Sequence, residues 1–310
     1  LDYFSYIRCR IINATIHMLI DSFLKYLEFE KNYSPQTIKS YKADLIQFEE
    51  YFKNLSEELS PTNVDTDIIR QWIINLMDEG YTASSVGRKL SSLRSFYRFL
   101  LIKKEVTIDP TRKIVGPKKK KALPYFLKES EINRIIDEND YKEGFIGARD
   151  RMIIEMFYAT GIRLSELIGL NDTDIDFSQS LIKVTGKRNK QRLIPFDKEL
   201  KESMIEYINI RNNTLTEQPE AFFVRESGQR LYSGIVEKLV KRQLSKVVTL
   251  KKRSPHVLRH TFATAMLNNK ANLNAIKEIL GHSSLAATEV YTHTTFEELK
   301  NNYNQAHPRA

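Results

Sequence analysis

A stretch rich in proline, glycine and lysine between residues 109 and 124 constrains the possible folds most strongly. It contains Asp109-Pro110, Gly116-Pro117, the run Lys118 to Lys121, and Pro124. Proline lacks a backbone N–H and interrupts helices, and a run of like charges repels itself, so no regular element continues through this stretch. It therefore divides the 310 residues into two parts, each long enough to bury its own core.

The part before this stretch has the hydrophobic spacing of helices. Apolar residues recur at three- and four-residue steps in successive segments between Ile20 and Leu101. Ser34-Pro35 and Thr82 are typical helix starts, and Gly80 is a typical helix stop. This pattern predicts a four-helix domain over residues 18–108, preceded by an extension, residues 1–17, to which we assign no role.

The part after the stretch combines helices with a small β-sheet. Leu181 to Val184 and Gln191 to Pro195 are apolar and β-branched and flank a Gly/Asn turn, which predicts a hairpin. Helical spacing covers residues 129–138, 147–159, 198–211, 233–247, 255–268 and 273–280, with short helices after Ser283 and Phe296. The sequence thus predicts a mainly α protein with a small β-sheet, in which a basic linker (109–125) leads to a second, α+β domain (126–310).

The charge balance indicates an anionic partner. The chain has 48 Lys and Arg against 39 Asp and Glu, a net charge of +9, which favours nucleic acid. A solvated surface is the competing interpretation for any single basic residue. The candidate DNA-binding residues are Lys39, Lys42, Arg88, Lys89, Arg94, Lys118, Lys119, Lys120, Lys121 and Arg188.

Composition also excludes several classes of protein. The single cysteine, Cys9, rules out an internal disulfide scaffold and a cysteine-based zinc site. No apolar run approaches the roughly 20 residues that span a bilayer. The first stretch is interrupted by charged and polar residues and lacks the cleavage pattern of a signal peptide. We therefore expect a cytoplasmic protein without a membrane partner.

The segment His256-Val-Leu-Arg259-His carries the clearest chemistry. Ser254-Pro255 is a helix start, and residues three apart share a helix face, so His256 and Arg259 are expected side by side. A guanidinium holds two phosphate oxygens and an imidazole moves a proton near neutral pH. Alone, this pair is weak evidence, because most such residues in a basic protein are not catalytic.

Further candidates lie on both sides of this segment. Arg163 follows a glycine helix stop, and Lys187 lies at the predicted hairpin tip, where a flexible ammonium reaches outward. Downstream, His282 precedes a serine-capped helix whose end would carry Tyr291. Each of these residues taken singly has a structural interpretation, a surface charge or a half-buried tyrosine.

Taken in order, these residues resemble the signature of the tyrosine site-specific recombinases. The strings A-T-G-I-R-L-S-E-L, V-T-G-K-R-N-K, H-V-L-R-H-T-F-A-T and L-G-H-S-S-L-A-A-T-E-V-Y-T-H look like the bacterial XerC/XerD group. The ending A-H-P-R-A is also similar to that group and favours a XerC-like chain. The resemblance spans about 19–310.

The resemblance implies a role for each matched residue. Tyr291 is the expected nucleophile, which forms a 3′-phosphotyrosyl link, and Arg163 and Arg259 hold the phosphate oxygens. Lys187 is the expected acid for the leaving oxygen and His256 the acid–base partner of the nucleophile. The remaining residues are His282, a phosphate donor, and Glu166, an accessory carboxylate. Neither a cofactor nor a metal is expected.

The resemblance also implies partners. We expect double-stranded DNA at a specific recombination site, a tetramer formed with itself or a related recombinase, Holliday-junction strand exchange, and a septal DNA translocase as a further partner. The segment at about 296–306 is expected to dock onto a neighbouring protomer. Chromosome-dimer resolution is the main functional hypothesis. A mobile-element integrase or invertase with the same chemistry, a type IB topoisomerase and a non-catalytic DNA-binding protein remain alternatives.

Overall fold

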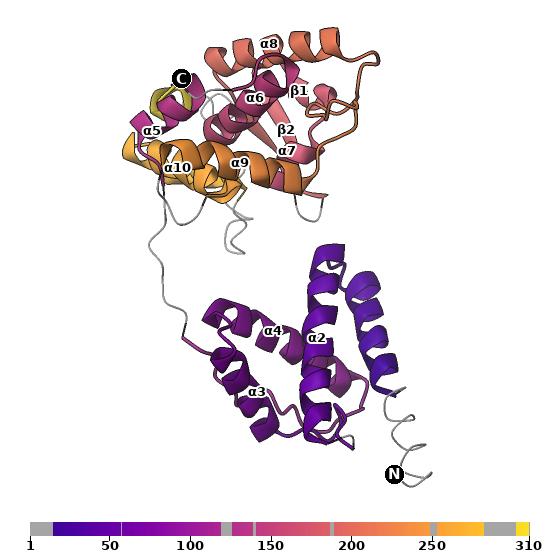
Figure 1. The fold of residues 1–310 in the computed structure, drawn as a ribbon. Helices are drawn as coiled ribbons and strands as arrows, with labels where there is room; N and C mark the ends of the chain where they lie inside the picture. The colour runs from indigo at the N-terminus through magenta and orange to yellow at the C-terminus, as the bar shows by residue number, and fades with distance from the viewer. Residues whose placement is uncertain are drawn as a thin grey trace. The chain divides into compact units, whose positions relative to one another are not determined.

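The computed structural model describes residues 15–56, 58–118, 126–138, 141–186, 189–248, 253–281 and 302–309. The chain divides into two units, Leu1–Ala122 and Leu123–Ala310 (Figure 1). The first is helical and the second combines helices with a small sheet, which confirms the predicted mainly α fold. Within the described ranges, no helix is both long and apolar enough to cross a membrane.

Capping side chains set the helix ends of the first unit. The Ser34 hydroxyl accepts a hydrogen bond from the N–H of Thr37 at 3.3 Å, and Thr82 accepts one from Ser85 at 3.2 Å, which confirms both predicted starts. Gly80, the predicted helix stop, comes directly after the C-cap Glu79 with φ +86°. After helical residues 15–25, the elements are a π-helical turn (Tyr26–Glu30), α2 (Pro35–Leu55), α3 (Thr66–Asp78) and α4 (Ala83–Ile102).

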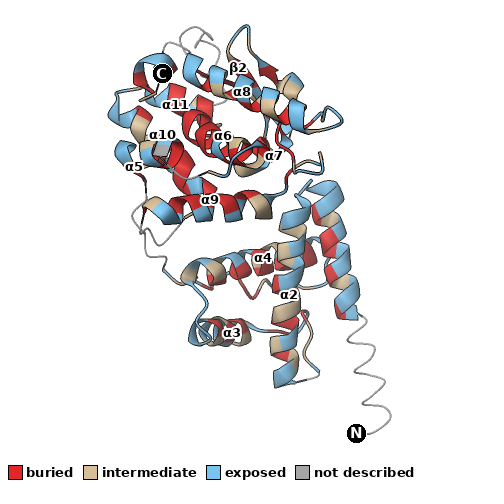
Figure 2. Ribbon diagram, turned by 45° about the horizontal axis from the view of Figure 1, so that its top comes forward, coloured by how far each residue is buried: buried red, intermediate tan, exposed pale blue. Residues whose placement is uncertain are grey.

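Aromatic side chains fill the core of the first unit. Helix α4 packs against α2 and α3. Between α2 and α3, the rings of Phe48 and Trp72 lie 4.8 Å apart, and Trp72 is buried. The buried residues of each helix lie along one stripe (Figure 2). This stripe is the structural counterpart of the three- and four-residue spacing in the sequence.

A buried carboxylate links α2 to α4 in this unit. Asp44 pairs with Arg88, with the Lys89 ammonium at 3.2 Å and with the Ser92 hydroxyl at 3.1 Å. Lys89 is itself buried and also donates to Gln47. Because an unpaired charge in the interior is costly, Asp44 and Lys89 depend on one another.

Replacing Asp44 by alanine should destabilise the first unit by about 3 kcal/mol, because Lys89 then keeps a buried charge without its carboxylate. Trp72 is the only tryptophan of the chain, so its fluorescence during chemical unfolding reports on this unit alone. The control is Asp67→Asn, which removes the exposed pair with Arg70 and should cost less than about 1 kcal/mol. Equal losses in both variants would contradict the argument.

The second unit contains the predicted hairpin and most of the predicted helices. Three short elements were not predicted: helix α7, the 3-10 turn that follows it, and the two-residue strand β1. The elements are α5 (Glu129–Asn133), a π-helical turn (Arg134–Glu138), α6 (Phe145–Thr160), α7 (Leu164–Gly169), a 3-10 turn (Asp172–Asp174), β1 (Ile175–Asp176), β2 (Leu181–Thr185), β3 (Gln191–Pro195), α8 (Lys198–Thr214), α9 (Ser233–Val247), α10 (Pro255–Asn268) and α11 (Leu273–Leu280).

Helix α6 lies at the centre of this unit. It packs against α8 and α10, and most of its residues are buried (Figure 2). The antiparallel sheet has the order β1-β2-β3 and places Ile182 opposite both Ile175 and Ile194. Helix α11 contacts β3 and α10. The carboxyl ends of α6 and α11 and the strand β3 thereby frame one region of the unit.

Residues 302–309 pack into the core of their own unit. Tyr303 is fully buried, and its hydroxyl donates to the Ala159 carbonyl at 2.9 Å and lies 3.2 Å from Asp197 Oδ2. The ring of His307 stacks on Tyr303 at 5.0 Å, and burial lowers the pKa of His307 to about 4, so it is neutral at neutral pH. Docking onto a neighbouring protomer stays a prediction. Residues 282–301 lie outside the described ranges. The helix predicted after Ser283 and the beginning of the helix predicted after Phe296 fall within that segment.

Candidate active site

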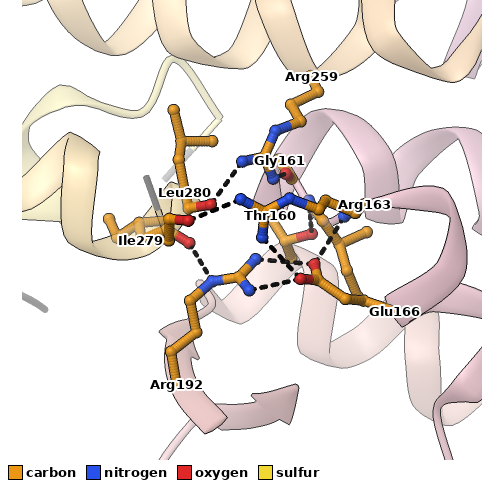
Figure 3. Close-up of polar contacts among 10 residues, drawn as sticks. Thr160, Gly161, Arg163, Glu166, Arg192, Arg259, Ile279 and Leu280 are labelled. Carbon is orange, nitrogen blue, oxygen red and sulfur yellow. Dashed lines mark hydrogen bonds and ion pairs between the residues drawn. The ribbon is translucent and has the colours of Figure 1, made fainter. Parts of the chain in front are cut away.

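Three guanidinium groups converge at the carboxyl ends of α6 and α11 (Figure 3). Arg163 is the residue before α7, Arg192 lies in β3, and Arg259 lies in α10. These residues are far apart in the sequence. The fold brings them together because α10 packs on α6 while β3 packs on α11.

Glycines at the two helix ends expose the carbonyls that bind these groups. Gly161 ends α6 with φ +59° and Gly281 ends α11 with φ +60°, the left-handed conformation typical of a helix C-cap. The last carbonyls of a helix lack internal partners and carry the negative end of its dipole, so they stabilise cations. The two glycines therefore prepare the binding points of the arginines.

Each arginine uses these carbonyls. Arg259 is buried and donates to the carbonyls of Gly161 and Leu280. Arg163 Nη2 donates to the Gly281 carbonyl at 2.7 Å. Arg192 Nε donates to the Ile279 carbonyl at 2.6 Å. All three guanidinium groups are thus held by backbone groups whose positions the helices fix.

Glu166 is the carboxylate among these cations. It is 4% exposed and lies in the first turn of α7. Its oxygens accept hydrogen bonds from the N–H of Arg163 at 2.9 Å and from Arg163 Nη1 at 2.7 Å. The fork of Arg192 completes the set at 2.7 and 2.8 Å. One carboxylate therefore holds two guanidinium groups in a fixed geometry.

The charges of the site are unbalanced in favour of the cations. Burial by itself raises the pKa of Glu166, but the hydrogen bonds from Arg192 and Arg163 outweigh it and lower the pKa to about 2. Burial, followed by the charges of Arg163 and Arg192, lowers the pKa of Arg259 to about 10. Counting the residues that the structure describes, three guanidinium groups therefore face one carboxylate at neutral pH. The side chain of Arg163 is 32% exposed, so the excess positive charge is open to solvent and suits an anion such as a phosphate.

The structure places some of the predicted catalytic residues here. Arg163, Glu166 and Arg259 lie together, and His256 is exposed in the first turn of α10. Lys187, His282 and Tyr291 lie outside the described residues. Two described glycines precede Lys187 and His282 in the chain. A Cβ built on Gly186 would lie 3.2 Å from Glu166 Oε1, and Gly281 binds Arg163.

Arg192 was missed from the sequence. In the hairpin register it faces Val184, and the next residue on the same face of β3 is Ile194; both are buried. An arginine on the buried face of a strand needs a carboxylate partner. The position of Arg192 on the same strand face as Ile194 is the sequence signal that could have identified it as a site residue.

The candidate DNA-binding residues differ in their surroundings. Lys39, Lys42 and Lys118 are exposed, and so is Arg88, although it pairs with Asp44. Lys89 is buried, with its ammonium on Asp44, and Arg94 donates to the Ile114 carbonyl. The candidates outside the described residues are Lys119, Lys120, Lys121 and Arg188.

No candidate metal centre was identified where the structure describes the chain. Within those ranges, no three or more His, Cys, Asp or Glu side chains are grouped so that they could hold a metal ion.

Comparison with known families agrees with this geometry. The phage integrase family matches residues 125–298, and the N-terminal SAM-like domain of phage integrases matches residues 20–104. The chain belongs to the phage integrase family of tyrosine recombinases. It is 37% identical to the tyrosine recombinase XerC of Chlorobaculum tepidum, with 94% of each chain covered. It is also 37% identical to XerC of Pelotomaculum thermopropionicum, with 95% of this chain and 99% of that protein covered.

Solved structures share the fold. The XerH site-specific recombinase bound to a palindromic difH substrate has a TM-score of 0.70 at 21% identity, covering 91% of this chain and 83% of that one. The Tn1549 transposon integrase in complex with circular intermediate DNA has a TM-score of 0.69 at 19% identity, covering 91% and 98%. The resemblance to the XerC group read from the sequence is therefore confirmed, since the curated relatives carry that name.

A methyl group on Gly161 should disturb the packing at the end of α6. The Cβ of Gly161→Ala would lie 2.5 Å from Phe262 Cδ1 and 2.9 Å from Leu280 Cδ2, at a positive φ. Gly228→Ala is the control, because Gly228 has φ +74° in the same unit and nothing within 4 Å of its Cβ. Since overpacking costs about 1–3 kcal/mol, Gly161→Ala should lose that much more stability than the control in chemical unfolding followed by circular dichroism. Equal losses would show that this close approach carries no cost.

Proposed function

We propose that this recombinase cuts and rejoins double-stranded DNA at a specific site through a 3′-phosphotyrosyl intermediate. The observation that supports it is the excess of positive charge held at the ends of α6 and α11. There Arg163 and Arg192 share the carboxylate of Glu166, and Arg259 is held by helix carbonyls. Such a site favours a group that gains negative charge in the transition state, as a scissile phosphate does.

The proposed reaction begins with attack by the Tyr291 hydroxyl oxygen on the scissile phosphorus. The phosphorus–oxygen bond to the 5′ side breaks as the bond to Tyr291 forms, and Lys187 protonates the departing 5′ oxygen. His256 takes the proton of the tyrosine. The new phosphotyrosyl bond conserves the energy of the broken one, so a 5′ hydroxyl of a partner strand reverses the step without a nucleotide cofactor.

The positive groups of the site stabilise the transition state in this proposal. Arg163 and Arg259 bind the non-bridging oxygens, and His282 donates a further hydrogen bond. Loss of one such donor typically costs about 10²–10³ in rate. Glu166 orients Arg163 and does not itself react. The helix carbonyls fix the arginines before DNA arrives, so little reorganisation is needed during the reaction.

We further propose that the protein works as a XerC-like recombinase in the cytoplasm. The four-helix domain (18–108) binds one side of the duplex, the linker (109–125) follows the backbone, and residues 126–310 bind the other side. Four protomers, of this chain alone or with a related recombinase, hold two sites and exchange strands through a Holliday junction. A septal DNA translocase is the proposed partner in resolving chromosome dimers. The names and nearly complete coverage of the curated relatives support this role.

The leading alternative is an integrase or invertase of a mobile element with the same chemistry. The fold does not separate the two, because a Xer recombinase and a transposon integrase match it comparably. Mapping covalent protein–DNA complexes across the chromosome separates them. One chromosomal site near the replication terminus supports dimer resolution, and sites that flank an inserted element support the alternative.

Incubation with a nicked suicide duplex that carries the recombination site should trap a covalent adduct. Tyr291→Phe removes the nucleophilic oxygen and should bind DNA normally but form no adduct. The control is Tyr232→Phe, which makes the same change at an exposed tyrosine and should leave the adduct unchanged. Denaturing gel electrophoresis measures the adduct. An adduct that persists in Tyr291→Phe would refute the assignment of the nucleophile.

Binding should weaken steeply with salt, because much of it would come from neutralised phosphates. Lys42 is exposed on α2, and Lys42→Ala should weaken binding to all sequences and lower the log–log salt slope by about one. Arg70→Ala, which removes a cation already paired with Asp67 on α3, is the charge-matched control and should leave the slope unchanged. Fluorescence anisotropy at several salt concentrations measures both slopes. A wild-type slope near zero would contradict the proposed binding mode.

A further inference from the structure

Arg192 ties together two parts of the second unit that are distant in the sequence. Its Nη1 and Nη2 donate to the two oxygens of Glu166 in α7 at 2.7 and 2.8 Å (Figure 3). Its Nε donates to the Ile279 carbonyl at the end of α11 at 2.6 Å. All three guanidinium nitrogens therefore serve contacts inside the protein, and the side chain is only 11% exposed.

These contacts form a closed ring with the predicted catalytic arginine. Glu166 also binds Arg163, and Arg163 binds the Gly281 carbonyl, two residues after Ile279. A Cβ built on Gly281 would lie 3.1 Å from Arg192 Cδ, so the stem of Arg192 packs closely against the end of α11. Movement of Arg192 would therefore disturb both Arg163 and the point where the chain leaves α11 toward His282.

We propose that Arg192 is a positioning residue of the recombination reaction, which holds Glu166, and through it Arg163, together with the carbonyl end of α11 in the arrangement that the scissile phosphate requires. This inference rests on the proposed function. Lysine cannot replace Arg192, because a single ammonium cannot span both Glu166 oxygens and the Ile279 carbonyl in the geometry of a planar fork.

The surroundings of Glu166 predict how the loss of Arg192 appears in a pH profile. Among the described residues, the charged groups that face this carboxylate are Arg163 just before α7, Arg192 from β3 and Arg259 from α10, with the backbone of Gly186 close by. Burial raises the pKa of Glu166, and the bonds from Arg192 and Arg163 bring it down to about 2, so the wild-type carboxylate stays ionised in mild acid. Without Arg192 the pKa rises, and Glu166 takes up a proton and releases Arg163 at a higher pH than in the wild type.

The test compares Arg192→Lys and Arg192→Gln with a matched buried arginine, Arg211. Arg211 also forms a fork with a carboxylate, Asp172, at 2.8 and 2.6 Å, and donates to the carbonyls of Ala221 and Phe222 in the same unit. Arg211→Lys therefore controls for the loss of a buried fork that has no contact with Glu166. Thermal unfolding checks that each variant is folded, and Arg192→Lys, which keeps the charge, remains informative if Arg192→Gln unfolds.

The readouts are the rate of adduct formation on the suicide duplex, its pH profile, and the affinity for the same DNA. Arg192→Lys should lower the rate by about 10²-fold, the typical effect of a small misplacement, with unchanged DNA affinity. The acid limb of its profile should lie at a higher pH than in the wild type. Arg211→Lys should lower thermal stability yet keep the wild-type rate and profile.

Two further outcomes separate the inference from the function on which it rests. If the wild type forms no adduct, the proposed function fails. If the wild type forms one and Arg192→Lys matches Arg211→Lys in rate and pH profile, the positioning role fails while the proposed function stands. A combined Glu166→Gln and Arg192→Gln variant should lose less activity than the product of the two single losses, because both changes break the same link. Losses that simply multiply would count against the ring.

Discussion

The binding of guanidinium groups to the terminal carbonyls of two helices is the interaction on which the second unit depends. Helices α6 and α11 each end at a glycine in the left-handed conformation, and the carbonyls at those ends accept from Arg163, Arg192 and Arg259. A carbonyl offers partial negative charge without a full countercharge. The arginines are therefore fixed in place and still keep most of their positive charge.

This arrangement also explains why the fold is organised around α6. A nearly fully buried helix is rigid, so its last carbonyl gives Arg259 a fixed anchor. The turn before that end binds the carboxyl-terminal segment, since the Ala159 carbonyl accepts from Tyr303. One helix end therefore holds both Arg259 and the segment 302–309. A change in the packing of that segment would therefore shift the backbone at Gly161, two residues from Ala159.

Local signals in the sequence predicted much of the fold and part of the site. The helix starts at Ser34 and Thr82 and the hairpin followed from capping and turn chemistry, which act over a few residues. Arg163, Glu166 and Arg259 came from matched motifs, and the structure brings them together. The role of Arg192 could not be predicted in the same way, because its partners lie in α7 and α11 and only the fold makes them neighbours. The burial of Tyr303 and the ion pair between Lys89 and Asp44 could not be predicted either, because both depend on tertiary contacts.

A comparison between the arginines of this unit shows what sets the site apart. The buried Arg211 lies on Asp172, so this cation is matched by its own carboxylate. Such a pair is close to neutral and attracts no further anion. At the ends of α6 and α11, Arg163 and Arg192 share Glu166, and the partners of Arg259 within the described residues are carbonyls alone. A second carboxylate at this place would neutralise the charge that a phosphate needs, whereas removing Glu166 would leave Arg163 and Arg192 to repel each other. A single shared carboxylate is therefore the arrangement that keeps the arginines ordered and the site positive.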